Sequence, residues 1–234
     1  MSSTKKNRES GFSLVEMLLV CAIAMVMAAM SAPLVMNITN TYRLRSAGGQ
    51  YANMLQTARI RAITADSYEP VYATSGTLYG GFFNAFIDLN QQGGSTGTYT
   101  STPISEPGVV FSNSVVVQAA SSAPGTNNLY NQFLPGVTAG AVAINQNTWV
   151  GSNTAVVSFG SRGLPCYLAA APPTSGGGTC SYTFNNGGTL QPIAFEVFLQ
   201  NQTTGMWEAV TVNPAGRVRE WRYDTVSTSW IALN

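Results

Sequence analysis

The stretch FSLVEMLLVCAIAMVMAAMSAPLVM, from Phe12 to Met36, decides how this chain is built. It holds 25 residues, mostly Leu, Val, Met, Ala and Ile, and is long enough to cross a bilayer as an α-helix. Its one charged residue is Glu16. A carboxylate inside a hydrocarbon layer costs about 2.5–3.5 kcal/mol even on lenient insertion scales. We therefore expect an interaction that offsets this cost.

Basic residues lie on one side of this apolar segment. Lys5, Lys6 and Arg8 precede it, and none follows it immediately. Because the cytoplasmic flanks of membrane helices are enriched in Lys and Arg, we expect the N-terminus to stay in the cytoplasm. The chain would then cross the inner membrane once, and the residues after the segment would face the periplasm or the exterior.

The cysteines favour the same placement. Cys166 and Cys180 flank a Pro- and Gly-rich stretch of 13 residues, and a disulfide between them would staple that loop. Zinc is the weaker interpretation, because it would need two more ligands that the chain does not offer nearby. A disulfide places this part of the chain outside the reducing cytosol. Cys21, inside the apolar segment, is interpreted as a small hydrophobic residue.

The composition argues against an enzyme. Charged residues make up 9% of the 234 residues, against about 25% in a typical soluble domain, and there is no histidine. This excludes a Ser-His-Asp or Cys-His catalytic group and a His-ligated metal. A membrane-anchored enzyme would need a carboxylate pair, yet no acid stands in a recognisable motif. The acids considered are Asp88, Glu106, Glu196, Glu208 and Asp224. We expect no catalytic residue, no metal and no other cofactor.

A helical pattern continues beyond the apolar segment. Four residues recur at spacings of four, three and four and form one apolar stripe on a helix: Tyr51, Leu55, Ala58 and Ala62. Ser67 and Pro70 end this pattern. We predict one long helix with its first half, 12–36, in lipid and its second half, 37–66, packed on a globular domain. Gly48–Gly49 is interpreted as a weak point of that helix.

The remaining residues, 67–234, predict an antiparallel β domain. Short β-type runs alternate with Gly, Pro, Asn and Ser clusters, and the spacing leaves no room for βαβ crossovers. We predict six to eight strands. Gln91–Pro107 and Ser121–Gly140 are poor in core-forming residues and are expected to be surface loops. The fold class is therefore α+β.

The junction before the helix carries a specific motif. GFSLVEMLLV, from Gly11 to Val20, resembles the processing and assembly signature of type IV pilins and type II secretion pseudopilins. The resemblance implies that residues 1–11 are a leader, which a prepilin peptidase removes by cutting between Gly11 and Phe12. It also implies that Phe12 is then methylated. Glu16 would pair with the N-terminal amine of a neighbouring subunit, and a compensated charge is tolerated when it is buried.

Two ordinary interpretations of this segment fit less well. The acid of a simple membrane anchor could snorkel toward the cytoplasmic side, but such an anchor needs neither Glu16 nor the Gly-Phe junction. A secretory signal peptide has a shorter apolar region that is followed by a small-residue cleavage site. Here the helical pattern continues into the domain.

Two further stretches resemble the GspH/FimT type of minor pilins and pseudopilins. YANMLQTARIRAITADSYEPVYA (Tyr51–Ala73) is similar to the end of that family's long helix and its first strand. The matching positions are Ala58, Arg59, Ala62 and Ile63. VTVNPAGRVREWRY (Val210–Tyr223) is similar to the family's closing hairpin, whose Gly-Arg-x-Arg signature falls on Gly216, Arg217 and Arg219. The resemblance implies a type IV pilin-like fold, a long helix followed by two antiparallel sheets that form a sandwich-like domain.

AFIDLNQQGG, from Ala85 to Gly94, is similar to a weaker element of the family, an acidic turn. Calcium prefers six to eight oxygen ligands, several of them carboxylates. Here only Asp88 is charged, and Gln91 and Gln92 stand where acids would be needed. We interpret the stretch as a turn that ends a strand.

The closing hairpin also holds the one cluster of positive charge in the globular part. On a strand, Arg217, Arg219, Trp221 and Tyr223 share one face, and Arg222 lies beside them in sequence. Arginine forks next to aromatic rings suit the phosphates and bases of nucleic acid. Some family members with this motif are DNA receptors in natural transformation, so the resemblance implies DNA capture as an alternative function. In the structural alternative, the arginines pair with Glu208 or Glu220, or contact neighbouring subunits.

The sequence thus predicts a minor pilin or pseudopilin, near the filament tip or in the priming of assembly. Its expected partners are other pilin subunits, the prepilin peptidase and the inner membrane. The signature is shared by pili and secretion pseudopili. Removing Lys5, Lys6, Arg8 and Glu9 with the leader leaves 8 basic and 9 acidic side chains, whereas strong nucleic-acid binders have a wider basic footprint.

Overall fold

A computed structural model describes residues 13–78, 83–88, 108–138, 141–145, 154–168 and 180–233. The fold is α+β, one long helix and two sheets of mainly antiparallel strands, as the sequence predicts, and it is consistent with a type IV pilin-like fold. The chain divides into two units, Met1–Thr39 and Asn40–Asn234, which are described separately.

The helix α1 runs from Leu14 to Thr64 and so contributes to both units. In the first unit its large apolar side chains are exposed. In the second unit the predicted stripe, Tyr51, Leu55, Ala58 and Ala62, is fully buried. The last turns contain good helix formers, and the chain leaves the helix through Asp66, which adopts a left-handed φ of 47°. The second half of α1 therefore packs on the globular domain, as the spacing predicts.

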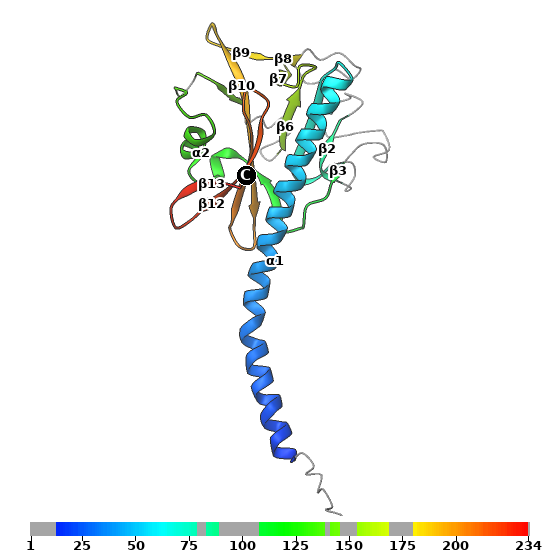
Figure 1. The fold of residues 1–234 in the computed structure, drawn as a ribbon, viewed down its shortest axis with the longest axis vertical. Coiled ribbons are helices and arrows are strands. Elements are labelled where there is room, and N and C mark those ends of the chain that lie inside the picture. Colours follow the sequence, from blue (N-terminus) through cyan, green and yellow to red (C-terminus); the bar gives the residue numbers. More distant parts are fainter. Residues whose placement is uncertain are drawn as a thin grey trace, which may run out of the picture. The chain divides into compact units, whose positions relative to one another are not determined.

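Two sheets make up the globular domain (Figure 1). The first has the order β3-β2-β1-β6-β7-β8, and the second has the order β13-β12-β11-β10-β4, with β5 and β9 also paired to β10. The strands of the first sheet are β1 (Glu69–Leu78), β2 (Phe83–Ile87), β3 (Gly108–Val109), β6 (Thr154–Phe159), β7 (Pro165–Leu168) and β8 (Cys180–Ser181). Those of the second are β4 (Val115–Gln118), β5 (Ala143–Asn145), β9 (Thr183–Asn186), β10 (Thr189–Asn201), β11 (Trp207–Val212), β12 (Val218–Asp224) and β13 (Ser229–Ala232).

The predicted number of strands, six to eight, is too low, since the described residues form thirteen. Several of the additional strands, such as β3 and β8, have only two residues. So short a strand is defined by its pairing partner and leaves no periodic pattern in the sequence. One pairing is parallel, that of β5 with β10.

The main core lies between the two sheets and α1. It joins the buried stripe of α1 to apolar residues of both sheets, among them Val71, Ile87, Val157, Phe195 and Val210. Because α1 covers strands from both sheets, it holds the sandwich together on that side. A second core lies on the other face of the second sheet, where Phe198, Trp207, Trp221 and Trp230 are buried.

The expectation of a surface loop at Ser121–Gly140 is wrong for much of that stretch. It contains the end of the short 3-10 helix η3 (Ala120–Ser122) and the whole of the helix α2 (Thr126–Phe133). Leu129 and Phe133 of α2 are buried in the second core, so α2 covers the face of the second sheet opposite to α1 (Figure 1). The other predicted loop, Gln91–Pro107, lies outside the described residues.

The predicted disulfide is present. Cys166 on β7 and Cys180 on β8 are bonded, with their Cα atoms 5.3 Å apart. Cys166 is fully buried against Tyr68, and Tyr182 packs on the same small cluster. The bond closes the stretch between two strands that are themselves paired.

The disulfide should contribute measurably to stability. Replacing Cys180→Ser opens a loop of about 15 residues, which should lower the free energy of unfolding by about 3 kcal/mol. Urea unfolding of the full chain in detergent, followed by tryptophan fluorescence, measures this change. A reducing agent should bring the wild type down to the level of the variant and leave the variant unchanged. Equal midpoints without reductant would contradict the expected role.

Candidate functional site

The first candidate site is the start of α1. Glu16 lies in the first turn of the helix, and its backbone N–H donates to the carbonyl of Ser13 at 3.0 Å. A carboxylate at this position interacts favourably with the unpaired N–H groups at a helix N-terminus. Around it, Leu14, Val15 and Met17 are more than half exposed. Glu16 is therefore one acid surrounded by exposed apolar side chains.

Among the described residues, α1 is the one helix whose length and apolar composition suit a membrane span. A signal sequence near the N-terminus would also be long and apolar enough to meet these two criteria. Gly11 and Phe12, the predicted processing residues, lie outside the described part of the chain. Their roles remain predictions at this point.

The second candidate site is built on the hairpin that joins β11 to β12. The side-chain Oδ1 of Asn213 accepts the backbone N–H groups of Ala215 (3.1 Å) and Arg217 (2.9 Å). The N–H of Gly216 donates to the carbonyl of Asn213 at 2.8 Å, and Gly216 has a φ of 77°. Only glycine adopts this left-handed conformation without steric cost. The tight turn fixes the backbone from which Arg217 projects.

Gly216 has a second structural reason to be glycine. Nε of Arg59, on α1, donates to the carbonyl of Gly163 at 2.9 Å. A Cβ on Gly216 would touch that carbonyl and would lie 3.1 Å from Nε of Arg59. The two stretches that resemble the GspH/FimT type, one from each end of the domain, therefore meet here. Arg59 bonds the turn between β6 and β7, and the lack of a side chain at Gly216 lets the hairpin lie close to both.

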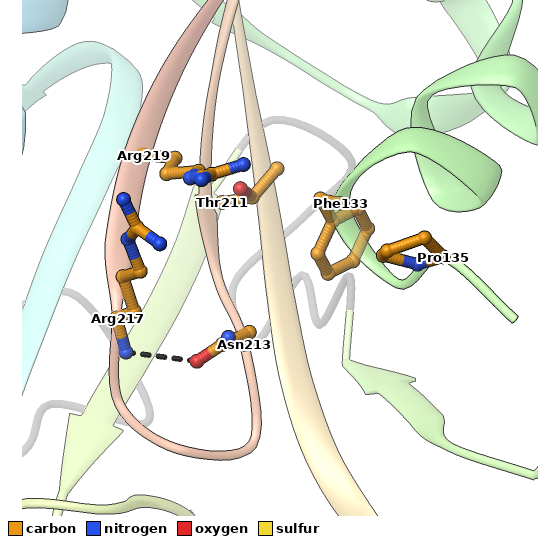
Figure 2. Close-up of a pocket in the computed structure, with 6 residues that line it drawn as sticks. All are labelled: Phe133, Pro135, Thr211, Asn213, Arg217 and Arg219. Atoms are coloured by element: carbon orange, nitrogen blue, oxygen red, sulfur yellow. Dashed lines mark hydrogen bonds between the residues drawn. The ribbon is translucent and has the colours of Figure 1, made fainter. Parts of the chain in front are cut away.

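The two motif arginines line a common cavity of ≈ 210 Å³. Figure 2 shows Thr211 of β11, Arg219 of β12 and Arg217, which directly precedes β12, with Phe133 and Pro135 across from them. Asn213 completes the described lining, and none of these described residues is Asp or Glu. We call this cavity the arginine pocket. Within the part of the chain that the structure describes, both cations therefore face a space that no carboxylate lines.

Arg219 is held more firmly than Arg217. Its guanidinium lies 6.0 Å from the centre of the Trp221 ring, within the range of a cation–π contact. Its Nε atom is buried and has no hydrogen-bond partner among the described residues. Arg217 is exposed. The pocket thus offers an anion one half-buried guanidinium, that of Arg219, and one on an exposed residue, Arg217.

The alternation of β12 separates the charged residues onto two faces. Trp221 and Tyr223 belong to the core under α2, on the side of Arg219. In contrast, Glu208 and Glu220 lie next to the glycines of α1 on the opposite face. The alternative in which the motif arginines pair with these acids therefore does not hold within the subunit.

Two of the predicted nucleic-acid residues do not belong to the arginine pocket. Trp221 is 3% exposed, and its Nε1 donates to the hydroxyl of Thr211 at 2.9 Å, so it is a core residue and not a platform for a base. Arg222 is exposed on the face of α1 and lines a different cavity, with Glu208. Sequence reasoning missed Phe133 and Pro135, because they lie in the stretch expected to be a surface loop.

Asp88 lies at the end of β2 and is fully buried. Its backbone N–H donates to the carbonyl of Pro70 at 2.9 Å, which suits the end of a strand. Gln91 and Gln92 lie outside the described residues.

Comparison with known proteins locates one motif. Residues 6–32 match the prokaryotic N-terminal methylation motif, the signal of type IV prepilin-like proteins. The match covers Lys6 and Arg8 of the basic flank, Gly11, Phe12, Glu16 and most of the apolar half of α1. No curated protein and no solved structure matches the chain at a significant level. The motif indicates a type IV pilin-like prepilin, which suggests a structural subunit that is processed by a prepilin peptidase and assembles with other pilins.

The contact of Gly216 with Arg59 and Gly163 is open to a matched test. Gly205 also has a positive φ, 70°, but has no atom within 4 Å of the position of a Cβ. Gly205→Ala should therefore cost only the conformational strain, about 1–2 kcal/mol. Gly216→Ala should cost about 1–3 kcal/mol more, because the new methyl group is also overpacked. Urea unfolding measures both, and equal losses would contradict the contact.

Proposed function

We propose that this chain is a minor subunit of a type IV pilus or of a type II secretion pseudopilus. The observation that supports this most directly is the methylation motif at 6–32, continuous with an apolar helix that leads into a mainly antiparallel β domain. In this proposal the prepilin peptidase cuts between Gly11 and Phe12, and Phe12 is methylated. The neutral composition and the absence of a recognisable resemblance to major pilins favour a rare subunit, near the tip or in priming.

Glu16 is the assembly residue in this proposal. Cleavage after Gly11 makes it the fifth residue of the mature chain, close to the new N-terminal amine in sequence. In a bundle of apolar helices its carboxylate meets the amine of a neighbouring subunit. Pairing replaces one buried unpaired charge on each subunit by a compensated pair, which offsets much of the cost of burial. The pair therefore favours ordered addition of a subunit over diffusion in the membrane.

The compartment follows from the same proposal. The basic flank stays in the cytoplasm, α1 crosses the inner membrane once, and the globular domain faces the periplasm. The disulfide between Cys166 and Cys180 supports this, because such bonds persist in oxidising compartments. Arg59 and Gly216 belong to the two stretches that resemble the GspH/FimT type, and they lie close together in the fold. This proximity supports that subtype.

The assembly role predicts two results in cells. The mature wild type should begin at methylated Phe12 when its N-terminus is analysed by mass spectrometry. Glu16→Ala should be inserted and cleaved normally, yet be absent from sheared filaments, because it leaves the neighbour's amine without a counter-charge. Glu16→Asp keeps a carboxylate and serves as the matched control, with at least partial incorporation expected. An intact Met1, or normal incorporation of Glu16→Ala, would refute the proposal.

The arginine pocket supports a second candidate function, the capture of DNA at the filament tip. Two arginines face a cavity whose described lining contains no acid, and phosphates are bound through such guanidinium groups. The apolar wall of Phe133 and Pro135 lies opposite the cations. DNA then binds mainly through its backbone, because Trp221 is buried and cannot stack on a base.

An electrophoretic shift of the full chain in detergent tests this second function. Arg217→Ala/Arg219→Ala should abolish a shift that the wild type gives at low salt. Each phosphate contact that is lost should reduce the slope of log affinity against log salt by about 1. Arg222→Ala is the matched control, because it removes an exposed arginine of the same strand from the opposite face. No shift by the wild type, or an equal effect of Arg222→Ala, would exclude DNA capture by this pocket.

A further inference from the structure

A carboxylate lies directly under the backbone of α1. Glu208, on β11, is 3% exposed. A Cβ on Gly48 would lie only 2.5 Å from Oε2 of Glu208, a separation that real side chains do not adopt. Gly49 follows it and would place a Cβ 3.7 Å from Oε2 of Glu220, on β12. The two glycines, predicted as a weak point of the helix, are therefore the place where the helix approaches two acids.

The strand register explains why both acids face α1. Glu208 is paired with Arg222, and Val210, two residues on, is paired with Glu220. Glu208 and Glu220 are thus diagonal neighbours on one face of the sheet, close enough for their charges to interact. Val210 and Val212 on the same face belong to the main core. The acid pair lies where that core ends.

Charged groups reach Glu208 from two of the elements packed against it. The helix α1 contributes Arg45, and β12 contributes Glu220 and Arg222. The residue paired with Glu208 on β10 is Leu199, which carries no charge. The neighbouring cavity of ≈ 180 Å³ is also lined by Tyr223 and Asp224, together with apolar residues such as Leu44 and Met206. Glu208 thus lies between a like charge, two exposed arginines and an apolar helix.

The balance of these groups favours the neutral form of Glu208. Burial and the neighbouring charge of Glu220 raise the pKa of Glu208 to about 7, although Arg45 and Arg222 act in the opposite direction. Burial also raises the pKa of Glu220, against the effect of Arg45. Asp224 behaves differently, because hydrogen bonds from Ser227 and from the backbone lower its pKa.

We propose that the contact of α1 with the second sheet at Gly48 is controlled by a proton on Glu208. With the proton bound, the carboxyl group packs against the glycine backbone and the helix rests on the sheet. When the carboxylate ionises, it attracts water and repels Glu220, so this turn of α1 separates from β11 more readily. The inference goes beyond assembly through Glu16, which requires no titration in the globular domain.

The direction of the pH effect follows from proton binding. The folded chain holds a proton on Glu208 up to about pH 7, whereas an unfolded chain releases it near the ordinary value of 4.5. Stability from this group is therefore complete at low pH and is lost as the pH rises through about 7. Between pH 5 and pH 8 the unfolding equilibrium constant should increase on the order of 50-fold.

The direct test is a carbon-13 NMR titration of the full chain in detergent micelles, labelled at the glutamate carboxyl carbon. The resonance of Glu208, assigned by its loss in Glu208→Gln, should titrate near pH 7. A midpoint near 4.5 would overturn the proposal. The titration itself is made on the wild type, so the absence of any glutamate resonance that titrates near pH 7 would overturn the proposal even if the variant does not fold.

Urea unfolding at pH 5 and pH 8 tests the consequence for stability. Glu208→Gln should remove most of the difference in stability between the two pH values. Glu220→Gln should lower the pH at which this stability is lost, because it removes a like charge beside Glu208. Asp224→Asn should leave the difference intact, because Asp224 titrates below this range. A difference that persists in Glu208→Gln would overturn the proposal.

A pair of glycine variants tests the geometry. Gly49→Ala should be neutral or mildly stabilising, because its methyl group makes an ordinary contact and alanine favours helix. Gly48→Ala should lower the urea midpoint, and the loss should shrink in a Glu208→Ala background, where the methyl group has room. Equal effects of the two alanines, or a loss independent of Glu208, would show that the carboxyl group does not contact the helix.

Discussion

The close approach of α1 to the two sheets is the constraint on which the rest of the globular domain depends. Half of the α1 residues in the main core are alanines, among them Ala47, Ala58 and Ala62, each nearly inaccessible to solvent. Small side chains let the helix backbone lie near the strands, and at Gly48 no side chain intervenes at all. A helix so placed contacts both sheets at once, so that one element closes the sandwich. The same closeness leaves room for the hairpin that Gly216 places beside Arg59.

This dependence explains which parts of the fold could be predicted from the sequence. The stripe of Tyr51, Leu55, Ala58 and Ala62 repeats with the period of a helix, and every member is buried. The helix α2 could not be predicted in the same way, because it has eight residues and its buried Leu129 and Phe133 stand among Asn, Gln and Thr. Tertiary packing stabilises it, because its buried side chains pack on the tryptophans of that face of the second sheet.

The candidate site, like the fold, could be predicted from the sequence only in part. The two-residue period of a strand predicts that Arg217 and Arg219 share a face; in the structure Arg217 lies just before β12, and both arginines line the arginine pocket. The depth of Trp221 could not be predicted, because the same period applies to a buried and to an exposed residue. The wall of Phe133 and Pro135 comes from a segment about 80 residues earlier in the chain, and only the folded structure brings it opposite the arginines.

The domain has few charged residues, so the separation of acids and arginines onto opposite faces of β11 and β12 strongly affects the charge of each face. With 9% charged residues, a cation has few acids within reach, and the glutamates nearest in sequence to the motif arginines are Glu208 and Glu220. The strands direct both acids toward α1 and both motif arginines toward α2. Each face then has its own electrostatics: on one side acids whose pKa values burial raises, and on the other two arginines with no carboxylate among the described residues of their pocket. An anion in the arginine pocket would therefore compete with no carboxylate among the described lining residues, which is the physical argument for treating that pocket as a candidate site.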